Sequence, residues 1–486
     1  MKRFKAMNAI VAAMLLLSLV LAACSKDKGN QAGDSKASPS ASAAASSPSA
    51  AASAKPKEKV KLVYAGWNGA WVDYNKRAVE RFHQMYPDSN IEVEVKEFPS
   101  GADYNKAMDV AFASNENYDI MLFNPGDTLA RADKGVFLDL APLAKEDKFD
   151  LIENFGDIMK PLDLKGKTYL MPYNVILDMF WYNKDMFDAA GLKYPDENTT
   201  WDQVFEMAKK LTKGDGANKV YGYSQNHYLP SITLNPIQHD GWSMMKDAFS
   251  PNYADPRVKQ ILTSYKALFD GGYAPSLAQY KLEKLDNRIL FAQGKAAMIV
   301  SNWWAPVYWN QLKYNNGTLG DDALKFKYGV TFLPKLSASA PAKTSNVTAG
   351  YGFAVNAKTK YPKEAYQFVK FMTTEIFDII GSIPSYKKAD PAKFNDIYNK
   401  FIDSKGAKHD NVYPQELVDT IKKVFVETKA VSSISPPPVA DASAQTAIGD
   451  LFNREGELYY LGKTGIDDFI NKMQDEGTKE GAKFKK

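Results

Sequence analysis

Cysteine, histidine and unbalanced charge are all scarce in this chain of 486 residues. Its single cysteine, Cys24, excludes an intramolecular disulfide framework. Its four histidines are scattered, and the sequence contains no Walker loop, no G-x-S-x-G elbow, no H-E-x-x-H and no cluster of Cys and His. The formal net charge of +4 is small and the charges are interspersed, which does not favour nucleic acid as a partner. The sequence therefore predicts neither a metal site nor a cofactor site.

The first 23 residues are predicted to be a signal peptide. A basic start is followed by an apolar run from Ala12 to Leu21, which is too short to cross a bilayer. The run ends in Leu21-Ala22-Ala23-Cys24, which resembles a bacterial lipobox and implies cleavage before Cys24 with lipid attachment to that residue. Several acyl chains anchor a protein stably, since each buried CH₂ contributes about 0.8 kcal/mol. The prediction is a secreted chain tethered to a membrane through Cys24.

Residues 24–57 are rich in Ser, Ala, Pro and Lys and nearly free of large apolar side chains. Such a segment cannot bury enough surface to offset its ordering entropy, so it is predicted to be a disordered tether. As a flexible coil it would span on the order of 30 Å. A tether of this length suits a protein held on the extracellular face of a single cell membrane, which favours a Gram-positive source. The roughly 430 residues that follow suit two lobes better than one core.

The region after residue 57 alternates strand-like and helix-like patterns. Strands are predicted at residues 60–66, 90–98 and 118–124, with a helix in each interval between them. This order predicts a parallel sheet covered by helices on both faces, which binds its ligand beyond the carboxyl ends of the strands. The loops at two of these ends, beginning at Trp67 and Asn124, should therefore lie side by side.

Further along the chain, a strand, a bend at Pro172 and a long second strand are predicted within residues 163–183. An amphipathic helix should begin at Trp201, with Thr200 as its N-cap and Gln203 completing a capping box. The C-terminal part of the chain is predicted to be mostly helical.

A set of segments spread over nearly the whole region after the tether carries a family resemblance. They are KGVFLDLAPLA (134–144), GKTYLMPYN (166–174), WYNKDMFDAAGL (181–192), TTWDQVFEMAKKLT (199–212), FAQGKAAMIVSNWW (291–304), YGVTFLP (328–334), AGYGFAVNAKTKYPKEAYQFVKFM (349–372) and IPSYKKA (383–389). In this order they resemble the extracellular sugar-binding proteins of bacterial ABC importers, the broad family that includes maltose-binding protein. No single segment is diagnostic, whereas the ordered set is specific.

The resemblance implies an α/β fold of the periplasmic-binding-protein type II, with two α/β lobes joined by a multi-strand hinge and a ligand cleft between them. It implies that the chain leaves the first lobe near Pro172, returns near Asn302 and crosses again near residues 376–384. Lobe closure about these crossings would bury the ligand. The implied boundaries are 58–173 and 302–378 for lobe 1, and 174–301 and 379–486 for lobe 2.

Aromatic side chains are the first candidates for ligand contact, because a sugar presents apolar C–H faces to flat rings. Trp67 lies just past a strand end and should face the cleft, whereas Trp71 either binds or packs. The resemblance places an aromatic contact at Trp303-Trp304, with Trp304 the better match and Trp303 open between contact and core. It also implies second-lobe contacts around His239 and Trp242, and a contact from Tyr351 in a glycine-rich loop.

Polar side chains should bind the sugar hydroxyls, and carboxylates make the stronger, charge-assisted hydrogen bonds. In the first lobe, Asn68, Asn124 and Asp127 follow strand ends, although Asp127 could equally cap the helix beginning near Thr128. Tyr173 and Asn174 match the family's crossing segment. Many relatives have an acid two residues after that Asn, whereas this chain has Ile176. Asp178 lies on the same strand face and either replaces that acid or pairs with a neighbouring cation.

The predicted function is a membrane-tethered receptor of an ABC importer that binds a sugar or oligosaccharide and passes it to a pair of permease subunits. A monomer is expected. One alternative is a lipid-anchored glycosidase-like enzyme, which would need two carboxylates flanking the scissile bond. Another is a binding protein for a polyamine, or for a metal held by Tyr459-Tyr460.

Overall fold

The computed structural model describes residues 59–485 except 69–70, 117, 133, 226–229, 239, 316, 340–346, 391–392, 394–399, 403–406, 411–412 and 428–441. Cys24, the tether and His239 therefore lie outside the described residues. No helix in the described ranges is both long enough and apolar enough to span a bilayer.

The first sheet has five strands in the order β2 (Ile91–Phe98), β1 (Val60–Trp67), β3 (Ile120–Phe123), β11 (Gly352–Val355) and β6 (Met171–Pro172). β1 runs parallel to β2 and β3, as the alternating pattern predicts. The sheet as a whole is mixed, because β11 is antiparallel to both β3 and β6. The predicted parallel arrangement is confirmed for β1, β2 and β3, and β11, a strand from far along the chain, adds antiparallel pairing to the sheet.

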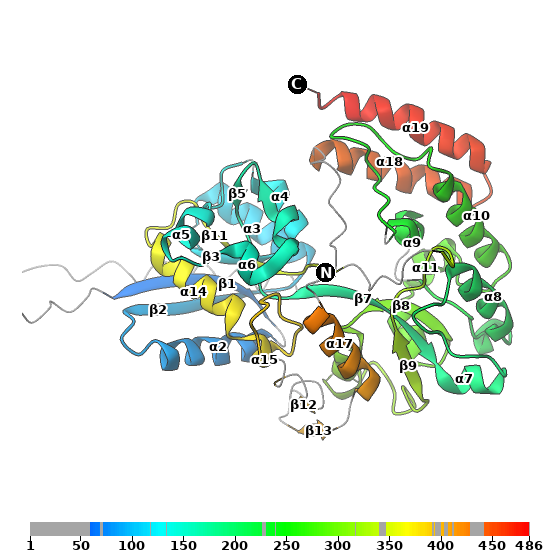
Figure 1. Ribbon diagram of the computed structural model, residues 1–486, viewed down its shortest axis with the longest axis horizontal. Coiled ribbons are helices and arrows are strands. Elements are labelled where there is room, and N and C mark those ends of the chain that lie inside the picture. The colour runs from blue at the N-terminus through cyan, green and yellow to red at the C-terminus, as the bar shows by residue number, and fades with distance from the viewer. Residues whose placement is uncertain are drawn as a thin grey trace, which may run out of the picture. The chain divides into compact units, whose positions relative to one another are not determined.

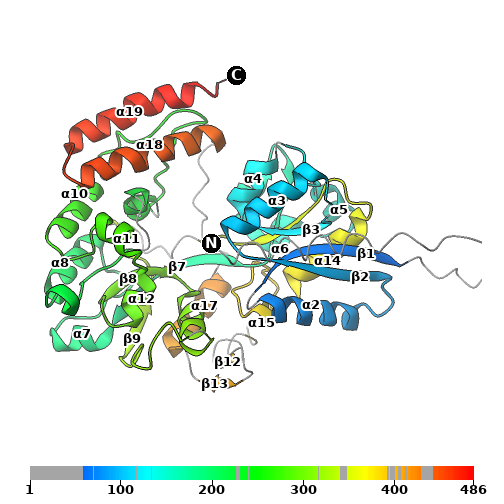
Figure 2. The ribbon, with the colours of Figure 1, turned by 180° about the vertical axis from the view of Figure 1, so that it is seen from behind.

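Helices cover both faces of this sheet (Figure 1, Figure 2). On one face α2 (Trp71–Met85) and α14 (Pro362–Thr374) pack together, with the rings of Phe82 and Phe368 5.1 Å apart. On the other face lie α3 (Ala102–Ser114) and α4 (Pro125–Ala132), where Tyr104 of α3 packs against Phe123 of β3. Strands β1, β3, β11 and β6 are largely buried, as the layered α/β prediction requires, whereas most residues of the edge strand β2 are half-buried or exposed.

The second sheet is built around the long strand β7 (Val175–Asn183). Three antiparallel strands pair with it: β10 (Val347–Ala349), β8 (Met298–Asn302) and β9 (Tyr328–Thr331). A second hydrophobic core, which includes Trp201 and Tyr265, packs α8 (Trp201–Leu211) and α10 (Pro256–Asp270) against this region. The predicted capping box of α8 is confirmed, since Thr200 accepts from the Gln203 backbone at 3.3 Å and Gln203 accepts from the Thr200 backbone at 2.8 Å.

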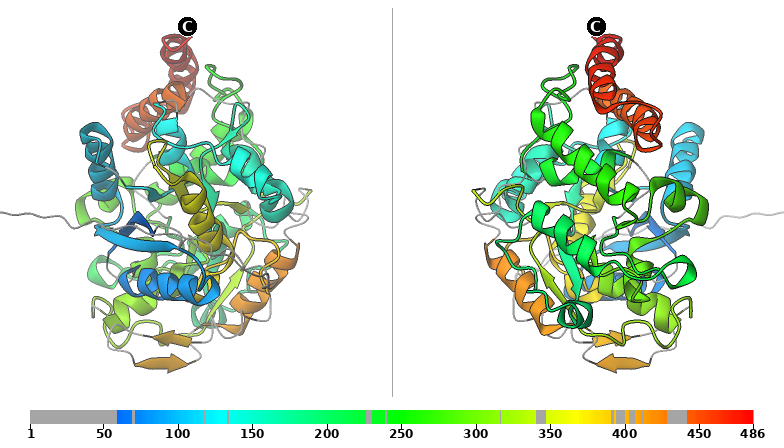
Figure 3. Two further views of the ribbon diagram at one scale, coloured as in Figure 1. Left: turned by 90° about the vertical axis from the view of Figure 1, so that its left-hand side faces the viewer. Right: turned by 90° about the vertical axis from the view of Figure 1, so that its right-hand side faces the viewer.

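The C-terminal part of the chain is mostly helical, as predicted. α18 (Ala442–Tyr460) and α19 (Ile466–Ala482) pack side by side, with the rings of Phe452 and Phe469 5.1 Å apart (Figure 3). The other elements are α5 (Ala141–Glu146), α6 (Leu151–Phe155), η1 (Gly156–Leu162), β4 (Asp163–Leu164), β5 (Lys167–Thr168), α7 (Lys184–Ala189), η2 (Gly216–Asn218), η3 (Pro230–Leu234), α9 (Asn235–Gln238), α11 (Leu277–Glu283), α12 (Asn287–Ala292), α13 (Ala305–Asn310), η4 (Gln311–Asn315), α15 (Phe377–Ile380), β12 (Lys400–Ile402), β13 (Lys408–Asp410) and α17 (Gln415–Glu427).

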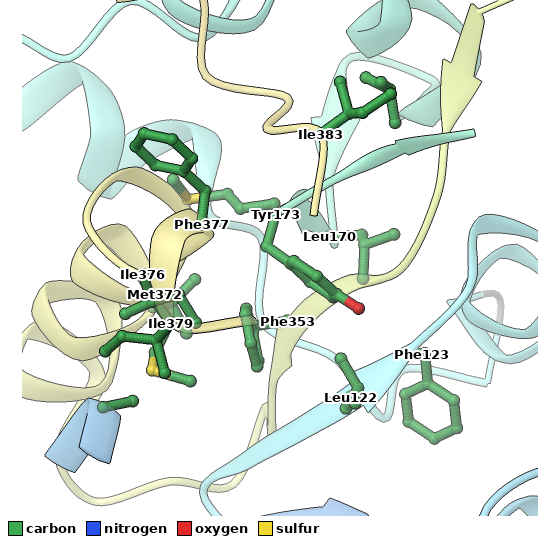
Figure 4. Close-up of a cluster of buried hydrophobic side chains, with 14 of the residues drawn as sticks. Leu122, Phe123, Leu170, Tyr173, Phe353, Met372, Ile376, Phe377, Ile379 and Ile383 are labelled. Carbon is green, nitrogen blue, oxygen red and sulfur yellow. The ribbon is translucent and has the colours of Figure 1, made fainter. Parts of the chain in front are cut away.

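The chain passes between the two sheets at residues 173–174, from β6 to β7, and again at residues 350–351, from β10 to β11. A third segment joins them, because the Ile383 carbonyl accepts from the Val175 backbone at 3.1 Å. Figure 4 shows the apolar cluster at this junction, where the centres of the Tyr173 and Phe353 rings lie 5.6 Å apart. The lobe boundaries stay predictions. Strands β9 and β10, which follow Asn302 in the chain, both pair with β7.

Candidate ligand-binding site

Four aromatic side chains meet at the carboxyl end of β1, and we call them the aromatic group: Trp67, Trp71, Tyr173 and Tyr351. The Trp67 ring lies 4.7 Å from Tyr351 at 80° and 5.4 Å from Trp71 at 81°. The Trp71 ring in turn lies 5.7 Å from Tyr173. Edge-to-face geometry of this kind fixes each ring by its neighbours. The structure thus brings together Trp67 and Tyr351, which lie 284 residues apart in the sequence.

Local packing explains why Trp67 adopts this position at the end of β1. Gly66 precedes it, and a Cβ there would come within 2.8 Å of the Asn75 amide nitrogen on α2. That amide donates to the Trp67 carbonyl oxygen at 3.3 Å, which joins the strand end to the helix. The Asn68 backbone donates to the Phe98 carbonyl at 2.8 Å, while its side chain is exposed.

The indole nitrogen of Trp67 is buried and has no hydrogen-bond acceptor in the described part of the chain. The residue as a whole is only half-buried. A buried donor without an acceptor costs free energy, which an arriving acceptor can recover. A ligand oxygen is the kind of group that would complete this site.

The crossing residues Asn174 and Gly350 hold Tyr351 in the aromatic group. The Asn174 side-chain oxygen accepts from the Tyr351 backbone at 2.8 Å, and its carbonyl oxygen accepts from the Gly350 backbone at 2.9 Å. A Cβ on residue 350 would collide with that side-chain oxygen, so the close approach requires glycine. Tyr173 is buried, and its backbone donates to the Tyr351 carbonyl at 3.0 Å. Asn174 therefore acts on the loop that carries Tyr351.

Asn124 and Asp127 lie at the start of α4, which begins at Pro125 rather than near Thr128. The Asn124 side chain accepts from the Asp127 backbone at 2.8 Å and donates to the Asp127 carboxylate at 2.6 Å. Asn105 also donates to this carboxylate, at 3.0 Å. Burial first, and the Asp127 charge second, raise the pKa of the Tyr351 hydroxyl. Asn124 is thus the capping residue, and the Asp127 carboxylate is held by Asn124 and Asn105 at the start of the helix.

The predicted neighbourhood of the two strand ends is confirmed by register. Tyr64 and Ala65 pair with Ile120 and Met121, which brings Trp67 beside the end of β3. Tyr104 lies between them, 6.2 Å from the Trp67 ring and 5.6 Å from the Phe123 ring. Sequence reasoning did not select Tyr104, because it lies inside a helix with no motif around it.

The strand β7 continues from the aromatic group with one half-exposed face. Ile176 and Asp178 are partly exposed, whereas Val175 and Leu177 are buried, as the alternation predicted. Asp178 lies opposite Asn302 of β8. Burial raises the pKa of the Asp178 carboxyl to about 6.

Trp304 lies just after β8, whose last residue, Asn302, is paired with Asp178 of β7. Its backbone donates to the Asn302 side chain at 3.0 Å, and its half-buried ring lies 5.5 Å from Tyr308 at 31°. The preceding residue, Trp303, donates from its backbone to the Leu177 carbonyl at 3.0 Å. Tyr308 was not selected from the sequence, although its spacing of four residues from Trp304 in a helix is a usable signal.

Two predicted ligand contacts are packed into the cores instead. Trp303 is 2% exposed and donates from its indole nitrogen to the Val175 carbonyl at 2.9 Å. Trp242 is also 2% exposed and donates to the Asn252 carbonyl at 3.1 Å. Neither ring offers a free face to a ligand. Trp242 therefore packs in the core instead of contacting a ligand, and of the two alternatives left open for Trp303 the structure shows core packing.

The alternative metal site receives no support from the described residues. Tyr459 and Tyr460 are buried in the second core, and Tyr460 donates to Thr233 at 2.8 Å. No group of three or more His, Cys, Asp or Glu that could hold a metal ion occurs among the residues that the structure describes.

An Asp178→Asn variant should be more stable than the wild type at pH 7 and equally stable near pH 4. The pKa of Asp178 is about 6 in the folded chain, above its ordinary value, so the folded state binds more protons than the unfolded state. Its contribution to stability therefore falls as the pH rises from about 4 to about 6, and the amide removes that fall. Thermal unfolding of both proteins from pH 4 to pH 7 measures the difference.

The exposed Asp322 provides the matched control, because a hydrogen bond from Lys325 lowers its pKa. Asp322→Asn should show no gain in stability with rising pH. A gain of the same size in both variants, or no gain in Asp178→Asn, would contradict the role of burial at Asp178.

Known proteins are similar to this chain in both sequence and fold. The family model described as "Bacterial extracellular solute-binding protein" matches residues 69–376. A putative binding protein of Brucella abortus is 30% identical over 233 residues, which is 47% of this chain and 51% of that protein. The multiple sugar-binding protein of Streptococcus mutans is 28% identical over 237 residues, which is 44% of this chain and 51% of that protein. The chain thus spans about half the length of these curated relatives.

Solved structures are similar over nearly their whole length. A sugar transporter structure from Rhizobium etli has a TM-score of 0.67 at 24% identity and covers 86% of this chain and 99% of that one. A substrate-binding protein of Listeria monocytogenes in complex with cycloalternan has a TM-score of 0.66 at 21% identity. The match covers 87% of this chain and 99% of that one. The maltose-bound T. maritima MalE3 has a TM-score of 0.59 at 20% identity. The match covers 86% of this chain and 98% of that one. At these identities the similarity establishes the predicted α/β fold and leaves the ligand open.

Proposed function

Because the chain belongs to the family of bacterial extracellular solute-binding proteins, we propose that it is the substrate-binding subunit of an ABC transporter for a sugar or oligosaccharide. Members of the family are binding proteins and not enzymes. The ligand is captured outside the cell and delivered unchanged to a pair of permease subunits. Binding without turnover replaces the alternative of a glycosidase-like enzyme.

The observation that carries the proposal is the aromatic group with the unpartnered indole nitrogen of Trp67. Flat rings suit the C–H faces of a sugar, and a buried donor suits a sugar oxygen. Asp127 follows the end of the neighbouring strand β3, and we assign its carboxylate to a sugar hydroxyl. Trp304 adds a half-buried ring just after β8. Neighbouring structures with bound maltose, cycloalternan, D-mannitol and ribitol support this ligand class.

The proposed binding motion is closure of two lobes about the sheet crossings. Lobe 1 comprises residues 58–173 and 302–378, and lobe 2 comprises residues 174–301 and 379–486. Both crossings carry candidate site residues, Tyr173-Asn174 and Tyr351. Movement at the crossings would therefore change the contacts of the aromatic group directly.

The proposed location is the extracellular face of the cell membrane. Residues 1–23 are removed as a signal peptide, Cys24 carries the lipid, and residues 24–57 form the tether. A monomer from a Gram-positive cell fits this arrangement. Contact with the permease would occur at the lobe rims.

Ligand screening of the mature, delipidated chain tests the proposal. Thermal-shift and calorimetric titration with maltose, maltotriose, cycloalternan, D-mannitol and ribitol should give at least one ligand with a Kd of about 1 μM or tighter, which is about −8 kcal/mol. Spermidine and ferric citrate are titrated in the same way, to test the alternatives of a polyamine ligand and a metal ligand. Binding of either, with no binding of any carbohydrate, would overturn the sugar assignment, and so would product formation from an oligosaccharide.

A further inference from the structure

The Tyr104 hydroxyl connects strands β1 and β3 at the end of their shared register. It donates to the Ala65 carbonyl of β1 at 2.8 Å and accepts from the Leu122 backbone of β3 at 3.0 Å. Tyr104 belongs to α3 and is buried, so a helix side chain makes hydrogen bonds to two strands of the sheet. We call this pair of hydrogen bonds the Tyr104 bridge.

The Tyr104 bridge lies where the pairing between the two strands ends. The register of β1 with β3 ends at Ala65 and Met121. Each strand continues on its other side, β1 beside β2 as far as Trp67 and β3 beside β11 as far as Phe123. Past this point, the spacing between the ends of β1 and β3 depends on side-chain contacts rather than on a backbone ladder.

Helix α3 contacts the candidate residues at both strand ends. The Tyr104 ring lies 6.2 Å from the Trp67 ring at 85°, and the Trp67 ring in turn lies 4.7 Å from Tyr351. The next residue of the helix, Asn105, donates to the Asp127 carboxylate at 3.0 Å. One helix therefore fixes Trp67 after β1 and Asp127 after β3 relative to each other.

We propose that Tyr104 is a positioning residue for sugar binding, because its hydroxyl fixes the spacing between the strand ends that carry Trp67 and Asp127. Without the hydroxyl, β1 can shift relative to β3, which changes the place of the Trp67 ring beside Tyr351. The effect on the ligand passes through Trp67, and Tyr104 itself stays buried. This assignment rests on the proposed function and adds a positioning residue to it.

The Tyr104 hydroxyl keeps its proton over the working pH range. Burial raises the pKa of this hydroxyl, and the smaller effect of the hydrogen bond from the Leu122 backbone lowers it. The donor role toward Ala65 and the acceptor role toward Leu122 are therefore constant. The contribution of the bridge to affinity should be the same at pH 5 and pH 8, in contrast to any contribution from Asp178.

A second buried tyrosine makes the same two kinds of backbone hydrogen bond and provides a matched control. The Tyr280 hydroxyl of α11 donates to the Gln225 carbonyl at 3.0 Å and accepts from the Gln225 backbone at 3.0 Å, and it also bonds to the Ser224 hydroxyl. Both backbone bonds go to one residue, so they hold a single segment rather than two strands. Tyr280→Phe thus removes comparable hydrogen bonds without affecting the spacing of β1 and β3.

The test compares Tyr104→Phe with Tyr280→Phe in calorimetric titrations with maltose, maltotriose, cycloalternan, D-mannitol and ribitol. Tyr104→Phe should weaken binding about fivefold or more, the size of the net contribution of one hydrogen bond, whereas Tyr280→Phe should stay within about twofold of wild type. In a Trp67→Ala background, Tyr104→Phe should change the affinity by less than about twofold, because the contact through which it acts is already lost. Thermal unfolding should show a similar loss of stability in both single variants.

Fluorine NMR of protein labelled with 5-fluorotryptophan measures the position of the Trp67 ring without a ligand. The Trp67 resonance is identified by its absence from the spectrum of Trp67→Phe. This resonance should shift in Tyr104→Phe and stay in place in Tyr280→Phe. A role of Tyr104 in stability alone would leave the two spectra alike at this resonance.

Each other outcome decides the question. Equal affinity losses in the two single variants, no loss in Tyr104→Phe, or an undiminished loss in the Trp67→Ala background would overturn the assignment while leaving the proposed function intact. An unmoved Trp67 resonance in Tyr104→Phe would do the same. A wild-type protein that binds none of the carbohydrates would overturn both.

A second variant covers the case in which Tyr104→Phe fails to fold. Tyr104→p-aminophenylalanine keeps the ring and a donor to the Ala65 carbonyl but offers a poorer acceptor to the Leu122 backbone. Its affinity should be lower than that of the wild type, and unchanged affinity in this variant would overturn the assignment.

Discussion

A Trp67→Ala variant is expected to bind the sugar about a hundredfold more weakly than the wild type while retaining its fold. Truncating a hot-spot aromatic contact costs about 3 kcal/mol, and about 1.4 kcal/mol corresponds to a factor of ten. Trp67 contacts Tyr351 and Trp71 and contributes the unpartnered indole nitrogen, so both stacking and hydrogen bonding are lost together. The residue is only half-buried, which limits the cost to stability.

Calorimetric titration with the best carbohydrate from the screen measures the affinity, and thermal unfolding measures the stability. Trp67→Phe separates the two contributions, because it keeps a flat ring and removes the N–H. Trp201→Phe is the matched control, since Trp201 also has a buried indole nitrogen without an acceptor among the described residues but lies in the second core. Wild-type affinity in Trp67→Ala, or an equal loss in Trp201→Phe, would remove the aromatic group as the site.

The sequence was sufficient for those parts of the site that follow from local patterns. The apolar strand before Trp67 and the strand before Asn124 placed both residues at the same edge of one sheet, and register bears this out. The alternation of β7 likewise placed Ile176 and Asp178 on one half-exposed face, whereas Asn174, expected on the same face, precedes β7 and is buried. These successes depend on strand periodicity, which acts over a few residues.

The long-range pairing of the site could not be predicted from such patterns. Strand β11 enters the first sheet antiparallel to β3, although more than two hundred residues separate them in the chain. That pairing places Tyr351 against Trp67. A pattern in the sequence identifies the strand but carries no information on its neighbour or direction.

Neighbouring tryptophans show a second limit of sequence reasoning. Trp303 and Trp304 are adjacent and follow the same strand, yet the first is 2% exposed and the second is half-buried. Their difference follows from the Val175 carbonyl, which accepts from the Trp303 indole nitrogen and fixes that ring in the core. The segment containing Trp242 has no regular period, so its burial against Tyr253 had no sequence signal at all.

Replacing Cys24 by serine is expected to abolish lipid attachment completely and to release the protein from the membrane fraction. Cys24 is the only cysteine in the chain, so no other thiol can accept the lipid. The acyl chains contribute about 0.8 kcal/mol for each buried CH₂, and a basic tether alone does not replace two or more chains. Labelling cells with a radioactive fatty acid, followed by detergent phase partitioning, measures both effects.

The same cysteine allows an independent measurement on the unmodified protein. If its sulfur carries a lipid, the denatured mature wild type should react with no maleimide, because the chain has no second thiol. Ser25→Ala changes the neighbouring residue and should leave both labelling and thiol blockage intact. A wild-type protein with a free thiol, or a Cys24→Ser variant that still incorporates fatty acid, would contradict the anchor. Either result would leave sugar binding unaffected, since the candidate site lies wholly within residues 59–485.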